Sequence, residues 1–505
     1  MAREGTAGTP ERPLAVAIIG AGFGGLGMAY YLRQAGVDSF TVFEKGQDVG
    51  GVWRENTYPG AACDVPSHLY SFSFESRYPW SKRFAPQAEI LEYMRHCARK
   101  YALYPRIRFG CEVVSADFDE QRGLWSIGLA NGERHTAQVL ISSVGQLHRP
   151  AYPKIAGLET FKGKTFHSAD WDHGYDLKGK SVAVIGTGAS AVQFVPAIVK
   201  DVKRLYLFQR SAGWVGPKFK AEFSLLEKIL LKRLPVLHDL DRARIFGIAE
   251  ALAYAYLGHP WAERLVTLLS KAQLRYQVRN PALRRKLTPD YPIGCKRLLL
   301  TAEWLPALTQ GNVEVVTGEI RNVTARGVRA ADGNLRQVDA IIFGTGFAAT
   351  DFLAPMQVRG LGGRDLRTEW RHGAEAYLGT AVAGFPNFFT LYGPNTNLGS
   401  GSIIYMLECQ QRYIVQLLQA RAAQGWSYAE VTAEAQAAYN REIRDRSRGS
   451  TFEGGCHSWY TTADGRNTNN WIGSMREFRR RTARPRLEDF RLVTLQSAKA
   501  PLQTA

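Results

Sequence analysis

The sequence predicts an α/β protein, because two strand–turn–helix units with glycine-rich turns and one long amphipathic stretch follow one another along its 505 residues. A hydrophobic content of 45% is enough for a large buried core, and a length of this kind corresponds to roughly two to four domains. The net charge of +18 comes from scattered Lys and Arg residues. We interpret this charge as a solvated surface with sites for phosphorylated ligands, and we expect no nucleic acid partner.

The first unit is LAVAIIGAGFGGLGMAYYLRQAG, a short apolar strand followed by a G-x-G-x-x-G turn at Gly20, Gly22 and Gly25 and then by a helix. Glycines in such a turn let backbone N–H groups approach a pyrophosphate at the helix N-terminus. The next strand ends at Glu44, 24 residues after Gly20, where an acid can accept hydrogen bonds from a ribose. The combination predicts a dinucleotide site, and a packing turn without a ligand is the alternative.

The second unit, SVAVIGTGASAVQFVPAI, has Gly186, Gly188 and Ala191 at the same offsets. Its following strand ends in Arg210, 24 residues after Gly186, in the position that the acid holds in the first unit. A guanidinium there suits the 2′-phosphate of NADP(H), which it can bind with two hydrogen bonds. The second site is therefore predicted to prefer NADP(H) to NAD(H), with an ordinary surface charge as the alternative for Arg210.

Two such sites in one chain indicate two Rossmann-like domains and an FAD enzyme that NADPH reduces. The runs VLISSVGQLHRPAYP and AIIFGTGF each lead from an apolar strand into a turn, which is consistent with two crossings between domains. We expect a discontinuous FAD-binding domain at 12–150 and 346–495, an NADP-binding domain at 151–215 and 289–345, a helical subdomain at 216–288, and a disordered tail at 496–505.

Three further motifs resemble one family. FKGKTFHSADWD has Phe161, Gly163, His167, Trp171 and Asp172 in the register F-x-G-x-x-x-H-x-x-x-W-D between the two glycine turns. The stretches GGVWRENTYPGAACD and YPIGCKR add two more matches. In these motifs the chain resembles the type I Baeyer–Villiger monooxygenases, class B flavin monooxygenases that convert ketones into esters or lactones.

The resemblance implies a reaction in which NADPH reduces FAD, O2 adds to the flavin C4a atom, and the resulting peroxide attacks a ketone. The resemblance also assigns Arg297 as the cation that stabilises the anionic peroxide. Such a cation is needed because an unpaired anion is costly in a site of low dielectric constant. Asp64 matches the family's acid and is expected to pair with Arg297. His167 is expected to hold hydrogen bonds where the domains are linked, rather than to exchange protons with the substrate.

The resemblance also places side chains around the cofactors. Lys296 and Ser211 are expected beside Arg210 at the NADP 2′-phosphate. Trp459 is expected to contact the nicotinamide cofactor, although a place in the core is an equal alternative. Gln209 and Trp53 are assigned to the cofactor surroundings.

Other classes of protein remain as alternatives. An N- or S-oxygenating flavin monooxygenase has the same two-nucleotide plan, and a non-oxygenating protein that binds FAD and NADPH is a second possibility. A flavin disulfide reductase is disfavoured, because the six cysteines include no C-x-x-C pair. They also lack metal-ligand spacing, so we expect no metal.

The stretch between Phe223 and Leu287 has apolar residues at helical spacing and is predicted to form the inserted helices. It is also basic, which keeps peripheral membrane contact as an alternative that we do not expect. The uncharged run from Leu14 to Leu32 contains five glycines and is interpreted as a strand, a turn and a buried helix. The N-terminal residues lack an apolar signal core. We therefore expect a cytoplasmic monomer or homodimer that acts on a ketone and O2.

Overall fold

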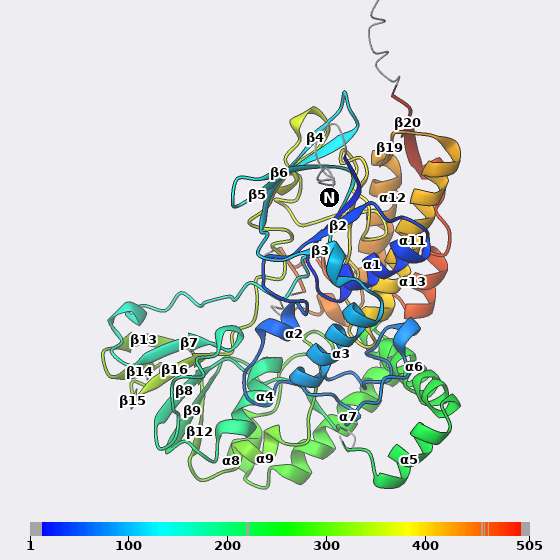
Figure 1. Cartoon of the computed structure of the whole chain (residues 1–505). Coiled ribbons are helices and arrows are strands. Elements are labelled where there is room, and N and C mark those ends of the chain that lie inside the picture. The colour runs from blue at the N-terminus through cyan, green and yellow to red at the C-terminus, as the bar shows by residue number, and fades with distance from the viewer. Residues whose placement is uncertain (1–12, 219–221, 456–457, 459, 463, 496–505) are drawn as a thin grey trace, which may run out of the picture.

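The computed structural model describes residues 13–218, 222–455, 458, 460–462 and 464–495. The predicted tail at 496–505 and the predicted cofactor contact Trp459 lie outside these residues. Figure 1 shows one sheet in the upper part of the molecule, a second sheet at the lower left, and a group of helices at the lower right. The chain leaves the upper part, builds the two lower parts, and returns.

The upper sheet has eight strands in the order β17-β4-β5-β6-β1-β2-β3, with β18 beside β6. Strands β1, β2, β6 and β18 are parallel, whereas β4, β5 and β6 pair antiparallel. The strands are β1 Leu14–Ile19, β2 Phe40–Phe43, β3 Ile107–Arg108, β4 Val113–Asp119, β5 Leu124–Leu129, β6 Arg134–Ser142, β17 Gln357–Arg359 and β18 Phe388–Thr390.

Helices from both ends of the chain cover this sheet. Helix α1 packs against α11, and the two share a core that includes the fully buried Tyr413 and Trp471. The elements of this part are α1 Phe23–Gln34, α2 Val52–Glu55, α3 Gln87–Lys100, α10 Leu366–Glu369, α11 Ile403–Gln424, α12 Ala433–Ser447 and α13 Met475–Arg481, with the antiparallel strands β19 Tyr428–Val431 and β20 Phe490–Val493.

The lower sheet has five parallel strands in the order β12-β9-β8-β16-β7. Its central strands read SVAVI and AIIF, the continuous apolar runs that a parallel sheet buried on both faces requires. The elements are β7 Lys164–His167, β8 Ser181–Ile185, α4 Ala189–Ile198, β9 Arg204–Gln209, α9 Trp304–Leu308, β12 Val313–Thr317 and β16 Ala340–Phe343, with the antiparallel strands β13 Ile320–Thr324, β14 Gly327–Ala330 and β15 Leu335–Gln337.

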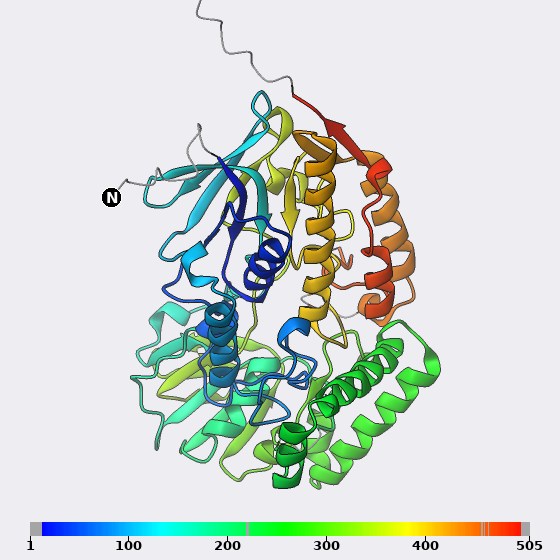
Figure 2. The same ribbon diagram turned by 45° about the vertical axis from the view of Figure 1, so that its right-hand side comes forward.

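The insertion is helical, as predicted. It contains α5 Leu225–Arg233, α6 Val236–Tyr256, α7 Pro260–Gln277 and α8 Pro281–Lys286. Ser224 begins α5 with a capping box, and Asn280 caps α8. Strands β10 Val215–Gly216 and β11 Leu299–Leu300 pair in parallel where the chain enters and leaves the insertion. Figure 2 shows α5, α6 and α7 in green at the lower right edge of the molecule, and Leu274 of α7 packs into the core of the lower sheet.

The remaining regular segments are short 3₁₀ turns. They are Ser73–Glu75, Tyr104–Arg106, Leu158–Thr160, Ser168–Asp170, Leu361–Gly363, Thr451–Glu453 and Leu487–Asp489. None of the helices in the described ranges combines the length and the apolar character needed to cross a membrane.

The predicted α/β class with two parallel-sheet units and a helical insertion is confirmed. The sheets also suggest a division into domains. We propose that strands within 14–142 and 357–390 belong to an FAD-binding domain, and that strands within 164–209 and 313–343 belong to an inserted NADP-binding domain. The helices at 225–286 would then form the subdomain predicted at 216–288.

Candidate active site between the two sheets

One pocket of about 1840 Å³ lies between the two sheets and the inserted helices. It is lined by both glycine turns, represented by Gly22 and Gly188, and by Asp64 and Arg297. Pockets for one small ligand usually measure about 300–1,000 Å³. This pocket therefore has room for more than one ligand, which suits a reaction between two cofactors and a substrate.

The first glycine turn has the geometry of a phosphate cradle. Gly20 has a φ of +99°, and a Cβ atom there would lie 2.7 Å from the Ser143 carbonyl oxygen. A Cβ atom at Gly25 would lie 1.9 Å from the Gly20 carbonyl oxygen. Helix α1 begins after Gly22 with no side-chain cap, so its first N–H groups are available to an anion. This turn fits the pyrophosphate of FAD.

Glu44 ends strand β2 at the wall of the pocket, as the spacing predicted. Its Oε2 atom accepts a hydrogen bond of 2.8 Å from the Ala21 amide, and its Oε1 atom accepts one of 2.7 Å from the Gly46 amide. Arg54 adds an ion pair of 3.1 Å to Oε1. A carboxylate has about four acceptor positions, so Glu44 can fix the turn and still accept from a ribose hydroxyl.

Trp53 lies on the short helix α2 and also lines the pocket. Its indole Nε1 donates a hydrogen bond of 3.0 Å to the hydroxyl of Tyr70, and the two rings meet edge to face at 5.8 Å. Gly50 and Gly51, with φ values of +130° and +52°, form the turn that precedes this helix. The ring is therefore held in place on the side of the pocket nearest the first glycine turn.

The second glycine turn repeats the geometry of the first. Gly186 has a φ of +105°, and a Cβ atom there would lie 2.4 Å from the Gly344 carbonyl oxygen. Helix α4 follows Gly188, again without a side-chain cap. Ala191 is fully buried, and its methyl group would lie 3.1 Å from a Cβ atom at Gly344. This turn fits a second dinucleotide.

Two cationic side chains, those of Arg210 and Lys296, lie near the end of strand β9. The Lys296 ammonium donates a hydrogen bond of 2.7 Å to the Ser211 hydroxyl and lies 4.7 Å from the centre of the Tyr291 ring. The pKa of Lys296 is lowered, first by burial and then by the charge of Arg210, while Asp290 acts in the opposite direction. Within the described residues neither Arg210 nor Lys296 forms an ion pair with a carboxylate. Two unneutralised cations beside a hydroxyl fit the 2′-phosphate of NADPH.

This pair of cations gives a first prediction. Arg210→Gln should weaken NADPH binding by about 10- to 100-fold, because a hydrogen bond to a charged group contributes about 1.5–3 kcal/mol. NADH binding should change little. Titration of the protein with each nucleotide measures both constants, and Lys203→Gln, an exposed cation before the same strand, is the control. An equal loss for NADPH and NADH would contradict the assignment of Arg210.

Gln209 lies beside the pocket rather than in its lining. Its side chain is buried and donates a hydrogen bond of 2.7 Å to the Lys286 carbonyl oxygen of helix α8. Its neighbours Phe208 and Arg210 line the pocket. Its assignment to the cofactor surroundings stays a prediction.

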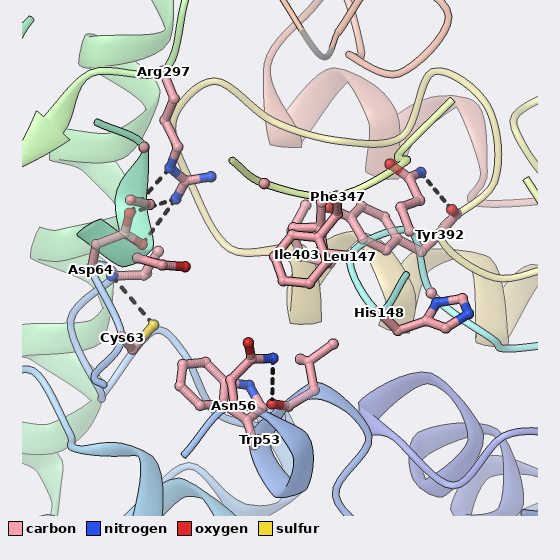
Figure 3. A pocket seen from close by; sticks show the side chains of 18 of the residues that line it. Trp53, Asn56, Cys63, Asp64, Leu147, His148, Arg297, Phe347, Tyr392 and Ile403 are labelled. Carbon is pink, nitrogen blue, oxygen red and sulfur yellow. Dashed lines mark hydrogen bonds and ion pairs between the residues drawn. The ribbon is translucent and has the colours of Figure 1, made fainter. Parts of the chain in front are cut away.

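Arg297 and Asp64 form a bidentate ion pair, shown in Figure 3. The Nε and Nη2 atoms of Arg297 donate hydrogen bonds of 3.1 Å and 2.8 Å to Oδ2, and Nη2 donates another of 2.9 Å to Oδ1. The Coulomb field of Asp64 raises the pKa of Arg297, so the guanidinium stays charged at any working pH. The Nη1 atom makes no hydrogen bond among the described residues. It points toward the open part of the pocket in Figure 3.

The loop that carries Asp64 is held to the lower sheet by Gln193 of helix α4. The Gln193 amide donates a hydrogen bond of 2.9 Å to the Ala62 carbonyl oxygen, and it accepts one of 3.0 Å from the Tyr58 hydroxyl. Gly60 has a φ of +80°, and a Cβ atom there would lie 2.7 Å from the Gln193 carbonyl oxygen. The sequence motifs do not indicate Gln193, because it lies on a helix with no local signal for this contact.

The segment that carries Arg297 is held by the insertion. The Leu298 amide donates a hydrogen bond of 3.3 Å to the hydroxyl of Tyr256 on α6, and the next two residues form β11.

Cys295 is buried and disulfide-bonded, which the wide spacing of the cysteines did not predict. The free thiols of Cys97 and Cys409 are buried, and burial raises the pKa of each to about 12.

An apolar wall faces the ion pair across the pocket in Figure 3. It includes Leu147, Phe347 and Ile403, and the Tyr392 backbone is fixed by a hydrogen bond of 2.7 Å from the Gln146 amide to its carbonyl oxygen. Burial lowers the pKa of nearby His148 to about 4, so this ring is neutral at pH 7. None of these residues was singled out from the sequence, although Leu147, His148 and Phe347 lie in the two runs that were expected to cross between the domains.

His167 lies at the end of strand β7, away from the pocket lining. It is fully buried, and its Nδ1 atom accepts a hydrogen bond of 3.0 Å from the Ala169 amide. Its ring packs against Tyr152 and Phe347, which do line the pocket. Burial lowers the pKa of His167. These contacts favour the predicted structural role over proton exchange with a substrate.

The other fingerprint residues build the edge of the lower sheet. A Cβ atom at Gly163 would lie 2.4 Å from the Asp339 carbonyl oxygen and 2.6 Å from the Phe161 ring. Trp171 packs against Phe194 of helix α4 at 5.3 Å. Asp172 forms an ion pair of 2.5 Å with Lys164, which lowers its pKa. These contacts hold strand β7 and the turn after it against the rest of the lower sheet, and the role of the motif in linking the domains stays a prediction.

A second prediction concerns His167. His167→Ala should retain FAD but lose about 3 kcal/mol of stability, because it removes a buried ring and the cap of a 3₁₀ turn. It should also release more H2O2 per NADPH consumed. His167→Asn, which can still accept from the Ala169 amide, should recover about 1 kcal/mol. Thermal unfolding and peroxide assays measure these effects. Loss of an ionisation from the pH profile of ester formation in both variants would instead indicate a catalytic base.

Comparisons with known proteins agree with this architecture. A model of the family described as "Flavin-binding monooxygenase-like" matches residues 14–239. A Baeyer-Villiger monooxygenase of Pseudomonas aeruginosa is 46% identical over 481 residues, covering 95% of this chain and 91% of the relative. A Baeyer-Villiger monooxygenase of Streptomyces coelicolor is 44% identical over 492 residues, covering 97% and 95%. A solved structure of OTEMO in complex with FAD and NADP is 27% identical, with a TM-score of 0.85, and the match covers 97% of this chain and 100% of that one.

The fold, the two dinucleotide turns in one pocket and these similarities define an FAD-dependent monooxygenase that uses NADPH. Within that class, the chain belongs to the Baeyer–Villiger monooxygenases.

Proposed function

We propose that this chain inserts one oxygen atom of O2 beside the carbonyl group of a ketone, giving an ester or lactone, with Arg297 as the stabilising cation. Bound FAD, once reduced by NADPH, activates O2 and supplies the inserted oxygen. The observation that carries the proposal is the Arg297–Asp64 pair. One guanidinium nitrogen has no hydrogen-bond partner in the described part of the chain and points into the pocket that both glycine turns line.

Asp64 positions the cation. Three hydrogen bonds fix the plane of the guanidinium, so Arg297 does not reorganise when negative charge develops on the reacting oxygens. A lysine would offer a single charged centre without this fixed plane. The attacking oxygen carries negative charge before it adds to the ketone, and this charge passes to the carbonyl oxygen as the new bond forms. The Nη1 atom would stabilise the charge in both places.

The remaining pocket residues bind the two cofactors and exclude water. The first glycine turn and Glu44 hold the FAD pyrophosphate and ribose, and the second turn with Arg210, Ser211 and Lys296 holds NADPH. The apolar wall formed by Leu147, Phe347 and Ile403 keeps water from the reacting atoms, which strengthens the field of Arg297.

Product analysis tests the proposal. The FAD-loaded enzyme is given NADPH, air, and a mixture of a cyclic ketone and a tertiary amine. The lactone should be the main oxygenated product. An N-oxide without any lactone would instead identify an N-oxygenating enzyme, and NADPH oxidation with no organic product from a panel of linear, cyclic and aromatic ketones would contradict the oxygenase function.

A further inference from the structure

The helical insertion leaves an unusual amount of apolar surface uncovered. In the described part of the chain, every exposed large hydrophobic side chain except Val114 and Tyr152 lies between residues 225 and 276. A concentrated apolar patch of this kind marks an interaction surface rather than ordinary scattered exposure. The patch belongs to α5, α6 and α7, which Figure 2 shows at the edge of the molecule.

Helix α7 carries the clearest part of this surface. Its outward stripe is formed by Trp261, Leu265, Leu268 and Tyr276, at the spacing of one helical face, and the exposed fractions of these residues are 61%, 51%, 65% and 84%. The opposite side of the helix is buried through Leu274. An aromatic residue therefore stands at each end of the stripe, with leucines between.

The neighbouring helices extend the surface. On α6, Tyr254 is 45% exposed, and its ring centre lies 6.3 Å from that of Trp261, so the apolar faces of α6 and α7 meet at this end. On α5, Leu225 and Leu226 are 76% and 65% exposed. Helix α5 packs against α6 in turn. The exposed apolar residues thus lie on three successive helices that pack against one another.

The charges of the insertion are sorted between its two sides. Two of its acidic residues pair with the upper part of the molecule: Glu227 with Arg83 at 2.7 Å and Asp239 with Arg77 at 2.6 Å. Arg244 on α6 pairs with Asp241 at 2.6 Å. The exposed basic residues of α5 and α7, in contrast, form no ion pair or side-chain hydrogen bond within the described residues. They are Lys228, Lys232 and Arg233 on α5, and Arg264, Lys271 and Arg275 on α7. The outer face is therefore both apolar and positively charged.

We propose that this face docks on the surface of a phospholipid bilayer that contains anionic lipids. Apolar side chains would enter the headgroup region while the Lys and Arg side chains bind anionic headgroups, as in interfacial amphipathic helices. The terminal Trp and Tyr suit the interface between water and acyl chains. A second copy of the chain is a poor occupant, because a two-fold interface brings each patch onto itself and would oppose cations to cations.

The same face adjoins the catalytic pocket. Ile248 and Arg244 of α6 line the pocket and are also exposed, with exposed fractions of 39% for Ile248 and 55% for the Arg244 side chain. On α7, Val266 lines the pocket, one position after Leu265 of the stripe. In a docked molecule, this side of the pocket would therefore lie beside the bilayer. If the proposed function holds, the substrate is a ketone apolar enough to partition into the membrane.

Vesicle flotation tests the docking with the full-length, FAD-loaded protein. The protein should float with vesicles that contain phosphatidylcholine and phosphatidylglycerol, and should bind far less to phosphatidylcholine alone. The variant Arg264→Gln, Lys271→Gln, Arg275→Gln should bind about 100-fold more weakly, since each cation near an anionic surface contributes about a fivefold factor. Raised salt should weaken the binding of the wild-type protein.

A matched control removes the same charge elsewhere. Lys178→Gln, Lys200→Gln, Lys203→Gln changes three exposed lysines around the lower sheet and should bind vesicles as the wild type does. The variant Leu265→Ser, Leu268→Ser keeps every charge and should lose binding. All three variants should keep their FAD and their rate with a small, water-soluble ketone, so the docking and the proposed function are tested separately.

Three results would overturn the docking proposal. The first is a wild-type protein that remains in solution with both kinds of vesicle. The second is a control variant that loses as much binding as the α7 variant. The third is a dimer in sedimentation velocity that Leu265→Ser, Leu268→Ser converts to a monomer without any change in vesicle binding, which would assign the face to a second copy. A long-chain ketone supplied in vesicles should be converted more slowly by the α7 variant than by the wild type, and equal rates would contradict delivery from the membrane.

Discussion

Replacement of Arg297 by alanine should lower the rate of ester formation by on the order of 10²–10³-fold, while NADPH oxidation continues and H2O2 accumulates. The side chain is a permanently charged group that faces the open pocket, and removing one preorganised donor from a developing oxyanion usually costs this much. The expected uncoupling distinguishes this residue from one needed for cofactor binding. Simultaneous assays of NADPH, H2O2 and ester measure it.

Two variants serve as controls for this prediction. Arg297→Lys keeps a positive charge but loses the bidentate contact with Asp64, so its ester yield should fall between those of the wild type and the alanine variant. Asp64→Asn keeps the shape of the partner and removes its charge, and should also give an intermediate yield. An alanine variant with the wild-type ratio of ester to NADPH would remove Arg297 from the mechanism.

Substitution of Gly25 by alanine should weaken FAD binding by about 100-fold or more. The new methyl group would lie 1.9 Å from the Gly20 carbonyl oxygen, and forced overpacking of this kind costs about 3 kcal/mol or more. The turn must then shift, and its N–H groups move away from the pyrophosphate. The ratio of flavin absorbance to protein in the purified variant measures the loss.

The second dinucleotide turn shows that the third position of the motif does not always require glycine. Ala191 occupies the same offset there and is accommodated without such a clash. Gly247→Ala is the control, because this glycine lies within α6 and a Cβ atom would meet nothing within 4 Å. It should keep its FAD and be unchanged or slightly more stable. Full FAD content in Gly25→Ala would contradict the cradle assignment.

Much of the architecture could be predicted because its determinants are local. A short apolar strand, a glycine turn and an acid or arginine at the end of the next strand each reflect the backbone geometry of one unit. Glu44 and Arg210 could therefore be placed at the pocket wall from spacing alone. Strand alternation also predicts that the side chains of Gln209 and Arg210 face opposite sides of the sheet.

The rest of the site depends on contacts between distant segments. Gln193 holds the Asp64 loop across 131 residues of sequence, and Tyr256 contacts the Arg297 segment across 42. No local pattern encodes such pairs. The insertion shows another limit: helical spacing predicted its helices, but an amphipathic pattern does not say whether the apolar face is buried. In α7 it is largely exposed.

Isotopically labelled O2 provides the most direct test of the proposed function. Wild-type enzyme given NADPH, labelled O2 and a cyclic ketone should yield a lactone with one labelled atom, at the ring oxygen. In a parallel reaction, Arg297→Ala should direct most of the label into H2O2. A lactone without label, or labelled lactone from Arg297→Ala at the wild-type yield, would contradict the account.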